Sequence, residues 1–358
     1  MQQISIKMLN INDIVITVEM LSIIAELERF NGKWETMEKI AEKRLISLKK
    51  ISTIESIGSS NRIEGNKLTD IEIETVLSKI DKTSFRSRDE QEVAGYAELM
   101  EIIFENYNQI QLTDNYIKQL HKILLQHTDK DQRHRGEYKK LSNAVAAYDA
   151  KGGEIGIIFE TATPFEVPMK MEELIKWTNT NLEEKLLQPL IVIGIFIVNF
   201  LAIHPFQDGN GRLSRALTSL LLLKSGYRYI PFSSLESIVE KNKDEYYRSL
   251  RQTQKTLKTE KQNYENWLLF FLKMLREQKR ILESKMPKEM EINLPKLAGD
   301  ILSLFDMQSI ITINDVVEKL CTNINTAKKS IKLLLDKDYI IKHGTTKGVW
   351  YTRNSKVL

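Results

Sequence analysis

The sequence predicts a mainly helical protein, and three observations support this fold class. Only 15 glycines and 7 prolines interrupt the 358 residues. The long stretches between them carry apolar residues at helical spacing, as in Ile71–Val76–Leu77–Ile80 and Leu235–Ile238–Val239. The apolar run from Leu190 to Ile203, LIVIGIFIVNFLAI, is too short to span a bilayer and is typical of a helix buried on all sides. We therefore expect a bundle of helices around this segment.

Composition limits the class of protein. The length favours two or three domains, and 42% hydrophobic with 28% charged residues is normal for a globular protein. A single cysteine, Cys321, excludes an intrachain disulfide framework and fits a reducing compartment. Met1–Asn10 has no positively charged start followed by an apolar stretch. We therefore expect a cytoplasmic protein without membrane contact, and the net charge of +4 is too small to indicate a partner.

Three regions follow one another along the chain. Residues 1–110 are helical and charged, with an interruption around Gly58–Asn66. Residues 111–285 form a second region, and a charged connector at Glu283–Glu291 ends it. Within it, Gly152–Pro168 (GGEIGIIFETATPFEVP) combines paired glycines, β-branched residues and prolines, which predicts a β-hairpin between helices. Residues 292–358 form the third region.

The third region has the element order of a winged helix-turn-helix domain. Apolar spacing predicts three helices and two short strands; they span Leu297–Phe305, Ile313–Leu320, Ile324–Asp336, Tyr339–Lys342 and Val349–Arg353. A turn around His343–Gly348 joins the strands. Three helices followed by a two-stranded wing is the pattern of this domain class.

The chemistry concentrates in His204–Arg215, which reads HPFQDGNGRLSR directly after the apolar run. Pro205 cannot continue a helix, and Asp208–Gly211 predicts a tight loop before the next helix begins. Backbone N–H groups at a helix N-terminus, together with the helix dipole, favour an anion. Each part of this stretch alone is more often structural, but their order predicts one anion site.

The side chains of the stretch suit a nucleotide phosphate. Asn210 adds a donor, and Arg212 and Arg215 lie on one helical face with guanidinium groups that suit phosphate oxygens. Asp208 supplies an oxygen ligand for Mg²⁺ shared with phosphates. His204 can act as a general base. These residues alone allow attack on either the α- or the γ-phosphate of a nucleotide. The stretch is neither a Walker loop nor a dinucleotide fingerprint.

HPFQDGNGRLSR resembles the Fic family motif, HxFx[D/E]GNGRxxR, at every defined position. The resemblance implies a helical Fic core that transfers AMP from ATP to a hydroxyl of a target protein. His204 would deprotonate that hydroxyl, Phe206 would anchor the loop, and Asp208 would hold Mg²⁺. Phosphate contacts would come from the residues that begin the second helix: Gly209, Asn210, Gly211, Arg212, Leu213, Ser214 and Arg215.

Two further stretches resemble parts of Fic proteins. The hairpin at Ile155–Pro168 is similar to the Fic flap, which pairs with a target segment by strand addition. Its central residues are Ile157, Ile158, Phe159 and Glu160. Tyr246 and Tyr247 follow the motif where similar proteins border the adenine with a tyrosine pair. A plain surface hairpin and a pair of core tyrosines are the alternatives.

Ser59–Asn66, SSNRIEGN, resembles the inhibitory motif [S/T]xxxE[G/N] of many Fic proteins, with Ser60, Glu64 and Gly65 in place. Its position before the catalytic motif implies the class with an N-terminal inhibitory helix. Glu64 would pair with Arg215 and deny it to the γ-phosphate. A helix-capping box starting at Asn61 and an exposed helical acid at Glu64 are the alternatives.

The third region allows a second kind of function. Lys328, Lys329 and Lys332 lie on the helix expected to read DNA, although winged helices also bind proteins. We therefore consider two functions, an adenylyltransferase restrained by Glu64 and a DNA-binding regulator whose Fic core senses nucleotide. Transfer of UMP or phosphate is a further alternative. The partners considered are a target protein with a Ser, Thr or Tyr hydroxyl, ATP with Mg²⁺, DNA and a second copy of the chain.

Overall fold

The computed structural model confirms a mainly helical fold. It describes residues 14–40, 42–78, 85, 87–148, 154–257, 259, 261–286, 295–305, 308–344 and 348–354. The chain divides into two compact units, one of Met1–Trp34 with Ile46–Glu283, the other of Glu35–Leu45 with Ser284–Leu358. No helix in these described stretches is both long and apolar enough to cross a membrane.

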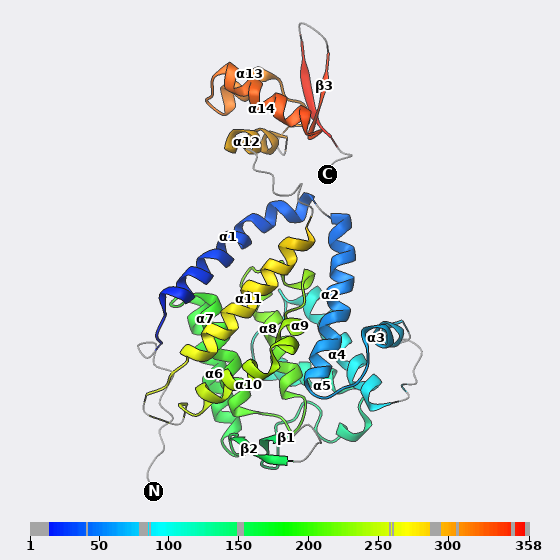
Figure 1. Cartoon of the computed structure of the whole chain (residues 1–358), viewed down its shortest axis with the longest axis vertical. Coiled ribbons are helices and arrows are strands. Elements are labelled where there is room, and N and C mark those ends of the chain that lie inside the picture. Colours follow the sequence, from blue (N-terminus) through cyan, green and yellow to red (C-terminus); the bar gives the residue numbers. More distant parts are fainter. Residues whose placement is uncertain are drawn as a thin grey trace. The chain divides into compact units, whose positions relative to one another are not determined.

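The helices before the motif make up much of the first unit (Figure 1). Their bounds are α1 Val18–Ile40, α2 Glu42–Ile63, α3 Asp70–Leu77, α4 Arg88–Asn106, α5 Asp114–Leu124, α6 Val167–Glu183 and α7 Pro189–Ile203, with a 3₁₀ turn at Asp129–Asp131. The interruption predicted around Gly58–Asn66 is present but begins later than Gly58, because α2 continues to Ile63 and α3 starts at Asp70. A Cβ atom at Gly58 would lie 2.7 Å from Oδ1 of Asp70, so this glycine lets the start of α3 approach α2 closely.

The helices from the motif onward complete the unit; they are α8 Asn210–Lys224, α9 Leu235–Lys241, α10 Lys243–Gln254 and α11 Glu265–Lys285, with a 3₁₀ turn at Ile230–Phe232. The apolar run forms α7, which contacts α6, α8 and α10, and all but one of its apolar side chains from Leu190 to Ile203 are buried, as predicted. Gly194 of α7 permits close packing, since a Cβ there would meet Leu268 of α11 at 2.7 Å. The neighbouring indole N–H of Trp267 donates to the Gly194 carbonyl at 2.6 Å.

The hairpin consists of β1 (Ala144–Tyr148) and β2 (Glu154–Glu160), which pair antiparallel with two irregularities in register. The bounds predicted for it, Ile155–Pro168, were wrong at both ends. Its first strand comes earlier in the chain, and Pro168 belongs to the first turn of α6, where proline is favoured. Gly152 and Gly153 lie outside the described residues.

The second unit contains three helices and an antiparallel strand pair in the predicted order; they are α12 Lys296–Leu304, α13 Ile313–Lys319, α14 Ile324–Asp336, β3 Ile340–His343 and β4 Trp350–Arg353. Apolar side chains from all five elements and the segments between them form its core, among them Ile301, Val316 and Ile331. Thr312 and Asp315 form a capping box at the start of α13.

Two helical glycines of the first unit give opposite expectations for stability. A Cβ at Gly95 in α4 would lie 2.1 Å from the backbone oxygen of Leu124 in α5, so Gly95→Ala should destabilise the protein by about 3 kcal/mol. Around Gly32 in α1, no atom of the described residues lies within 4 Å of such a Cβ, and Gly32→Ala should stabilise the protein by about 0.5–1 kcal/mol. Urea unfolding of both variants measures the two effects, and equal stabilities would contradict the close contact between α4 and α5.

Candidate active site

The loop between α7 and α8 reverses the chain through two residues with left-handed backbone conformation. His204 ends α7 with a φ of 53°, and Gly209 precedes α8 with a φ of 77°. Asp208 accepts from the N–H of Gly209 at 2.6 Å, but no side-chain capping bond to the first turn of α8 itself is present in the described part of the chain. Since the first N–H groups of a helix lack intrahelical acceptors, this end can receive an anion.

Asn210 holds the loop from inside. Its Oδ1 accepts from the N–H of Phe206 at 2.9 Å, and its Nδ2 donates to the Phe206 carbonyl at 2.8 Å. Asn143 donates to the same carbonyl at 3.1 Å. The amide of Asn210 is therefore used within the loop, which leaves the backbone N–H groups at the start of α8 to face an anion.

His121 of α5 supports the loop, a role that sequence reasoning missed. Its ring stacks on Phe206 with centroids 3.8 Å apart. Nδ1 accepts from the N–H of Gly136, so Nε2 carries the proton and donates to the Asp208 carbonyl at 3.0 Å. Burial lowers the pKa of His121 to about 4, so this neutral tautomer persists at physiological pH.

Two arginines and two carboxylates form an ion-pair network at the start of α8. Arg88 of α4 contacts Glu92 at 2.8 Å and Asp208 at 3.1 Å, and the buried Arg212 contacts the same carboxylates at 3.4 and 3.7 Å. Nε of Arg212 is buried and has no hydrogen-bond partner within the described part of the chain, while Nη1 forms the ion pair with Glu92 without hydrogen-bond geometry. A buried guanidinium with unused donors suits a phosphate group.

The residues present fit a magnesium ion that arrives with a nucleotide. The carboxylate of Asp208 is 40% exposed and lies at the end of α8 that faces an anion. One protein carboxylate completed by phosphate oxygens and waters is the usual setting of Mg²⁺. Asp208 would hold the ion, which would neutralise charge on the phosphates.

Arg215 is paired with the segment that resembles an inhibitory motif. Its Nη2 donates to Oε1 of Glu64 at 2.8 Å, while Nε donates to Oγ of Ser60 and Nη2 also to its carbonyl, each at 2.8 Å. Burial disfavours the charge of Arg215, but the Glu64 carboxylate together with Tyr246 and Tyr96 favours it, and the pKa of Arg215 is raised. A Cβ at Gly211 would lie 2.1 Å from Oε1 of Glu64. The carboxylate thus covers the N-terminal turn of α8, where an anion is expected.

Several contacts fix the end of α2, directly before Glu64. Arg62 bonds Glu240 of α9 at 2.8 Å, and Lys243 of α10 donates to the Ile63 carbonyl at 2.8 Å. Gly65 follows with a φ of 99°, a conformation that glycine adopts readily. The alternative of a capping box at Asn61 was wrong, because Asn61 lies in the last turn of α2 rather than at the start of a helix.

His204 is neutral at physiological pH. Burial and then the positive charge of Lys139 lower its pKa to about 4, against smaller contributions from the Leu201 carbonyl, Glu64 and Asp208. A neutral imidazole can accept a proton, as a general base must. Leu213 and Ser214, also expected at the phosphates, are fully buried, and the Ser214 hydroxyl donates to the Gly211 carbonyl at 2.7 Å. Their side chains are therefore not available to a nucleotide.

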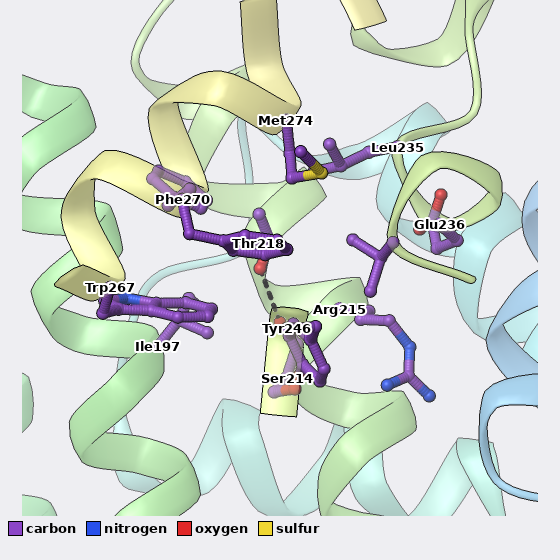
Figure 2. Close-up of a pocket in the computed structure, with 12 residues that line it drawn as sticks. Ile197, Ser214, Arg215, Thr218, Leu235, Glu236, Tyr246, Trp267, Phe270 and Met274 are labelled. Carbon is purple, nitrogen blue, oxygen red and sulfur yellow. Dashed lines mark hydrogen bonds between the residues drawn. The ribbon is translucent and has the colours of Figure 1, made fainter. Parts of the chain in front are cut away.

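A small cavity lies beside Arg215, between α8, α9, α10 and α11 (Figure 2). Its volume is about 30 Å³, which has room for water but not for a nucleobase. Tyr246 lines it and packs against Trp267 and Phe270 with centroids 5.8 and 6.0 Å away. Figure 2 shows the Arg215 guanidinium pointing away from these aromatic rings. Tyr246 is therefore a core residue, while Tyr247 beside it is partly exposed.

The hairpin approaches the helix that carries the tyrosine pair, since β2 contacts α10. Within β2, the backbone of Ile157 pairs with Ala146 and that of Phe159 with Val145, while Ile158 falls at a register shift. Glu160 pairs with Ala144 at the end of the strand. The structure describes these residues by their backbone alone.

The two buried histidines predict acid sensitivity. The folded-state pKa of His121 and of His204 is about 4, against 6.5 for a free histidine. Between these values the unfolded chain binds protons that the folded chain does not, so stability is greatest above pH 6.5 and falls towards pH 4. Each histidine contributes about 3 kcal/mol at most. Urea unfolding between pH 7 and pH 4.5 measures this slope, and His121→Gln should make it shallower; equal slopes would contradict the assignment.

Comparisons with known proteins agree with this geometry. The family model described as the Fic/DOC family matches residues 111–222, which span α5 to α8. The protein adenylyltransferase Fic of Drosophila sechellia is 28% identical over 205 residues, which cover 56% of this chain and 39% of the relative. The relative from Drosophila melanogaster matches equally well. The chain thus spans about two fifths of the length of these relatives.

Solved structures share the fold. A Fic family protein from Desulfovibrio desulfuricans G20 superposes with a TM-score of 0.60 at 21% identity, covering 95% of this chain and 97% of that chain. A Fic domain containing signaling protein from Bacteroides thetaiotaomicron superposes with a TM-score of 0.57 at 22% identity, covering 72% and 96%. With the matched residues enclosing the loop from His204 to Arg215, this part of the chain is a domain of the Fic/DOC family.

Proposed function

We propose that this protein transfers AMP from ATP to a hydroxyl of a target protein and that Glu64 restrains the reaction. The observation that carries the proposal is the contact of the Glu64 carboxylate with Arg215 and with the turn at Gly211. A carboxylate held at the open end of a helix and on a buried arginine stands where phosphate oxygens would bind. The adenylyltransferase name of the Drosophila relatives supports the same reaction.

The nucleotide phosphates would lie across the start of α8. Backbone N–H groups of Asn210, Gly211 and Arg212 and the unpaired Nε of Arg212 would hold the α- and β-phosphates, with Asp208 on Mg²⁺. The N–H of Gly209, which donates to Asp208 at 2.6 Å, would join them once Asp208 turns to the ion. Arg215 would hold the γ-phosphate once Glu64 has moved away. Since Tyr246 is packed in the core, Tyr247 is the better candidate to border the adenine.

His204 would start the chemical step. Its imidazole accepts the proton of the target hydroxyl as the hydroxyl oxygen attacks the α-phosphorus. The bond from this phosphorus to the bridging oxygen breaks, and pyrophosphate leaves with its charge stabilised by Arg212 and Arg215. Backbone groups of Ile157–Glu160 in β2 would pair with the target segment and present its hydroxyl.

Intact-mass measurement identifies the transferred group. The Glu64→Gly protein is incubated with ATP, UTP or GTP and Mg²⁺, alone and with a cell extract as the source of targets. An added AMP on the protein itself or on an extract protein supports the proposal. An added phosphate or UMP would replace it with another transfer reaction. Nucleotide binding without any transfer would favour the alternative, a regulator that senses nucleotide.

We also propose that the second unit binds DNA as a winged helix. Lys328, Lys329 and Lys332 are exposed along one face of α14, while Ala327 and Ile331 on the opposite face are buried. Adjacent exposed lysines on a helix that presents one face to solvent suit the phosphates of a duplex.

The three lysines should set the salt dependence of DNA binding. Replacing Lys328, Lys329 and Lys332 by Ala together should weaken binding to random duplex and reduce the slope of log affinity against log salt by about one per lysine. A mobility-shift titration at several salt concentrations measures the slope. Lys337→Ala, just after α14, is the control. If the unaltered protein does not bind duplex at low salt, the DNA-binding proposal is rejected.

A further inference from the structure

Lys139 is a buried lysine held by three oxygen atoms from three parts of the fold. Its side chain is almost inaccessible at 3% exposure. Nζ donates to Oδ1 of Asn143 and Oγ1 of Thr161, each at 2.7 Å, and to the carbonyl of Ile203 at 3.3 Å. Among the side chains that the structure describes, which leave out those of β1 and β2, no carboxylate lies at ion-pair distance from Nζ, and burial lowers the pKa of Lys139 to about 8. Burying an ammonium group is costly unless its donors are used, so the position of Lys139 calls for a specific role.

The three acceptors lie where the hairpin and the catalytic loop meet. Asn143 directly precedes β1, Thr161 directly follows β2, and Ile203 is the last residue of α7, next to His204. The Thr161 hydroxyl also donates to the Asn143 carbonyl at 2.6 Å, which closes the base of the hairpin. The single ammonium group therefore joins both ends of the hairpin to the end of α7.

Further hydrogen bonds continue from the same residues to the catalytic loop. The backbone N–H of Lys139 donates to the Pro205 carbonyl at 2.9 Å, and Asn143 donates to the Phe206 carbonyl at 3.1 Å. Residues on both sides of His204 are thus held by Lys139 and Asn143. An ammonium group suits this position, since it has three donors for three acceptors and the carbonyl end of a helix attracts a positive charge.

We propose that Lys139 is a positioning residue that holds the hairpin and the loop carrying His204 in one fixed arrangement. This rests on the proposed function, in which β2 presents the target hydroxyl and His204 removes its proton. A small displacement between the two would separate the base from the hydroxyl, and misplacement of reacting groups by about 1 Å can reduce a rate about a hundredfold. Lys139 touches neither substrate and acts through the residues that do.

The same charge also bears on His204. Three charged groups from the surrounding elements act on the imidazole: Lys139, Glu64 at the end of α2, and Asp208 in its own loop. Lys139 disfavours a second positive charge nearby, whereas the two carboxylates favour it. Lys139 therefore favours catalysis in two ways. Its hydrogen bonds hold the His204 loop beside the hairpin, and its positive charge favours the neutral form of the His204 imidazole.

Lys139→Met tests the proposal in the Glu64→Gly background, with Lys140→Met as the matched control. Lys140 is the next residue and is exposed, so the control removes the same charge without breaking these contacts. We expect Lys139→Met to speed hydrogen exchange in β1 and β2 by about tenfold. Transfer should fall by about a hundredfold, while the affinity for ATP measured by calorimetry stays unchanged. Lys140→Met should change neither.

Thr161→Val provides a second test if Lys139→Met does not fold. It removes one acceptor and should change hydrogen exchange in the same direction by a smaller factor. Unchanged exchange in β1 and β2 for either variant would overturn the proposal, and so would equal losses of ATP affinity and transfer. If Glu64→Gly itself transfers nothing, the proposed function fails, but hydrogen exchange still decides whether Lys139 holds the hairpin.

Discussion

Glu64→Gly should raise AMP transfer by about a hundredfold or more at the same ATP concentration, because it frees Arg215 and uncovers the turn at Gly211. The Glu64 carboxylate accepts a hydrogen bond from the buried Arg215 guanidinium and lies against the first turn of α8. Removing the side chain leaves a buried positive charge without its counter-ion, and a γ-phosphate is the natural replacement. Initial rates of labelled AMP incorporation measure the effect.

Glu64→Gln separates charge from bulk. The amide keeps the size of the side chain and remains above Gly211, but it offers Arg215 a neutral acceptor in place of a carboxylate. We expect transfer between that of the unaltered protein and that of Glu64→Gly. Glu55→Gly, earlier on α2, controls for the loss of an acid from this helix. If Glu64→Gly transfers no faster than the unaltered protein, Glu64 does not restrain the reaction.

His204→Ala should abolish transfer in the Glu64→Gly background, with a loss of about 10²–10⁴-fold and no loss of ATP affinity. His204 lies at the C-terminal end of α7, whereas the proposed phosphate contacts come from the start of α8. The base and the phosphate site are therefore on different elements. Calorimetry gives the ATP affinity and labelled transfer gives the rate. His343→Ala, in the second unit, is the control for removal of a histidine.

The pH profile gives a further check on His204. Since its pKa is lowered to about 4, the neutral base persists well below neutrality. Transfer should hardly change from pH 7.5 to 6, where an ordinary histidine would already be gaining a proton. A rate that halves near pH 6.5 would show that His204 titrates normally, and a His204→Ala protein with full activity would exclude it as the base.

The sequence predicted the active-site loop well because its signals are local. Pro205 follows the last turn of α7 and cannot continue that helix. Gly209 adopts a left-handed backbone conformation, and Gly211 lets the Glu64 carboxylate approach the backbone closely. The hairpin was half predicted, since β2 is rich in β-branched residues. Its partner β1 reads AVAAY, and alanine has little preference for strands, so nothing local indicated it.

The supporting residues could not be predicted from any local pattern. Lys139 and His121 are single polar residues in ordinary helical or loop sequence, and their roles depend on partners far along the chain. Glu64 and Arg215 are separated by 151 residues, and only the resemblance of two motifs suggested that they meet. Asn210 was expected to donate to a ligand, but its amide hydrogen-bonds to the backbone N–H and carbonyl of Phe206 in its own loop.

Under the proposed function, the contacts that fix the end of α2 would make Glu64 a tethered competitor of ATP. A competitor attached to the protein acts at a fixed effective concentration, which depends on how rigidly it is held and not on the amount of protein present. Nucleotide then binds with an apparent affinity reduced by the fraction of molecules in which Glu64 is away from Arg215. The strength of the proposed restraint would therefore depend partly on residues outside the candidate site, through the contacts of Arg62 with Glu240 and of Lys243 with the Ile63 carbonyl. Any event that loosens these contacts would increase the affinity for ATP without altering a residue that touches it.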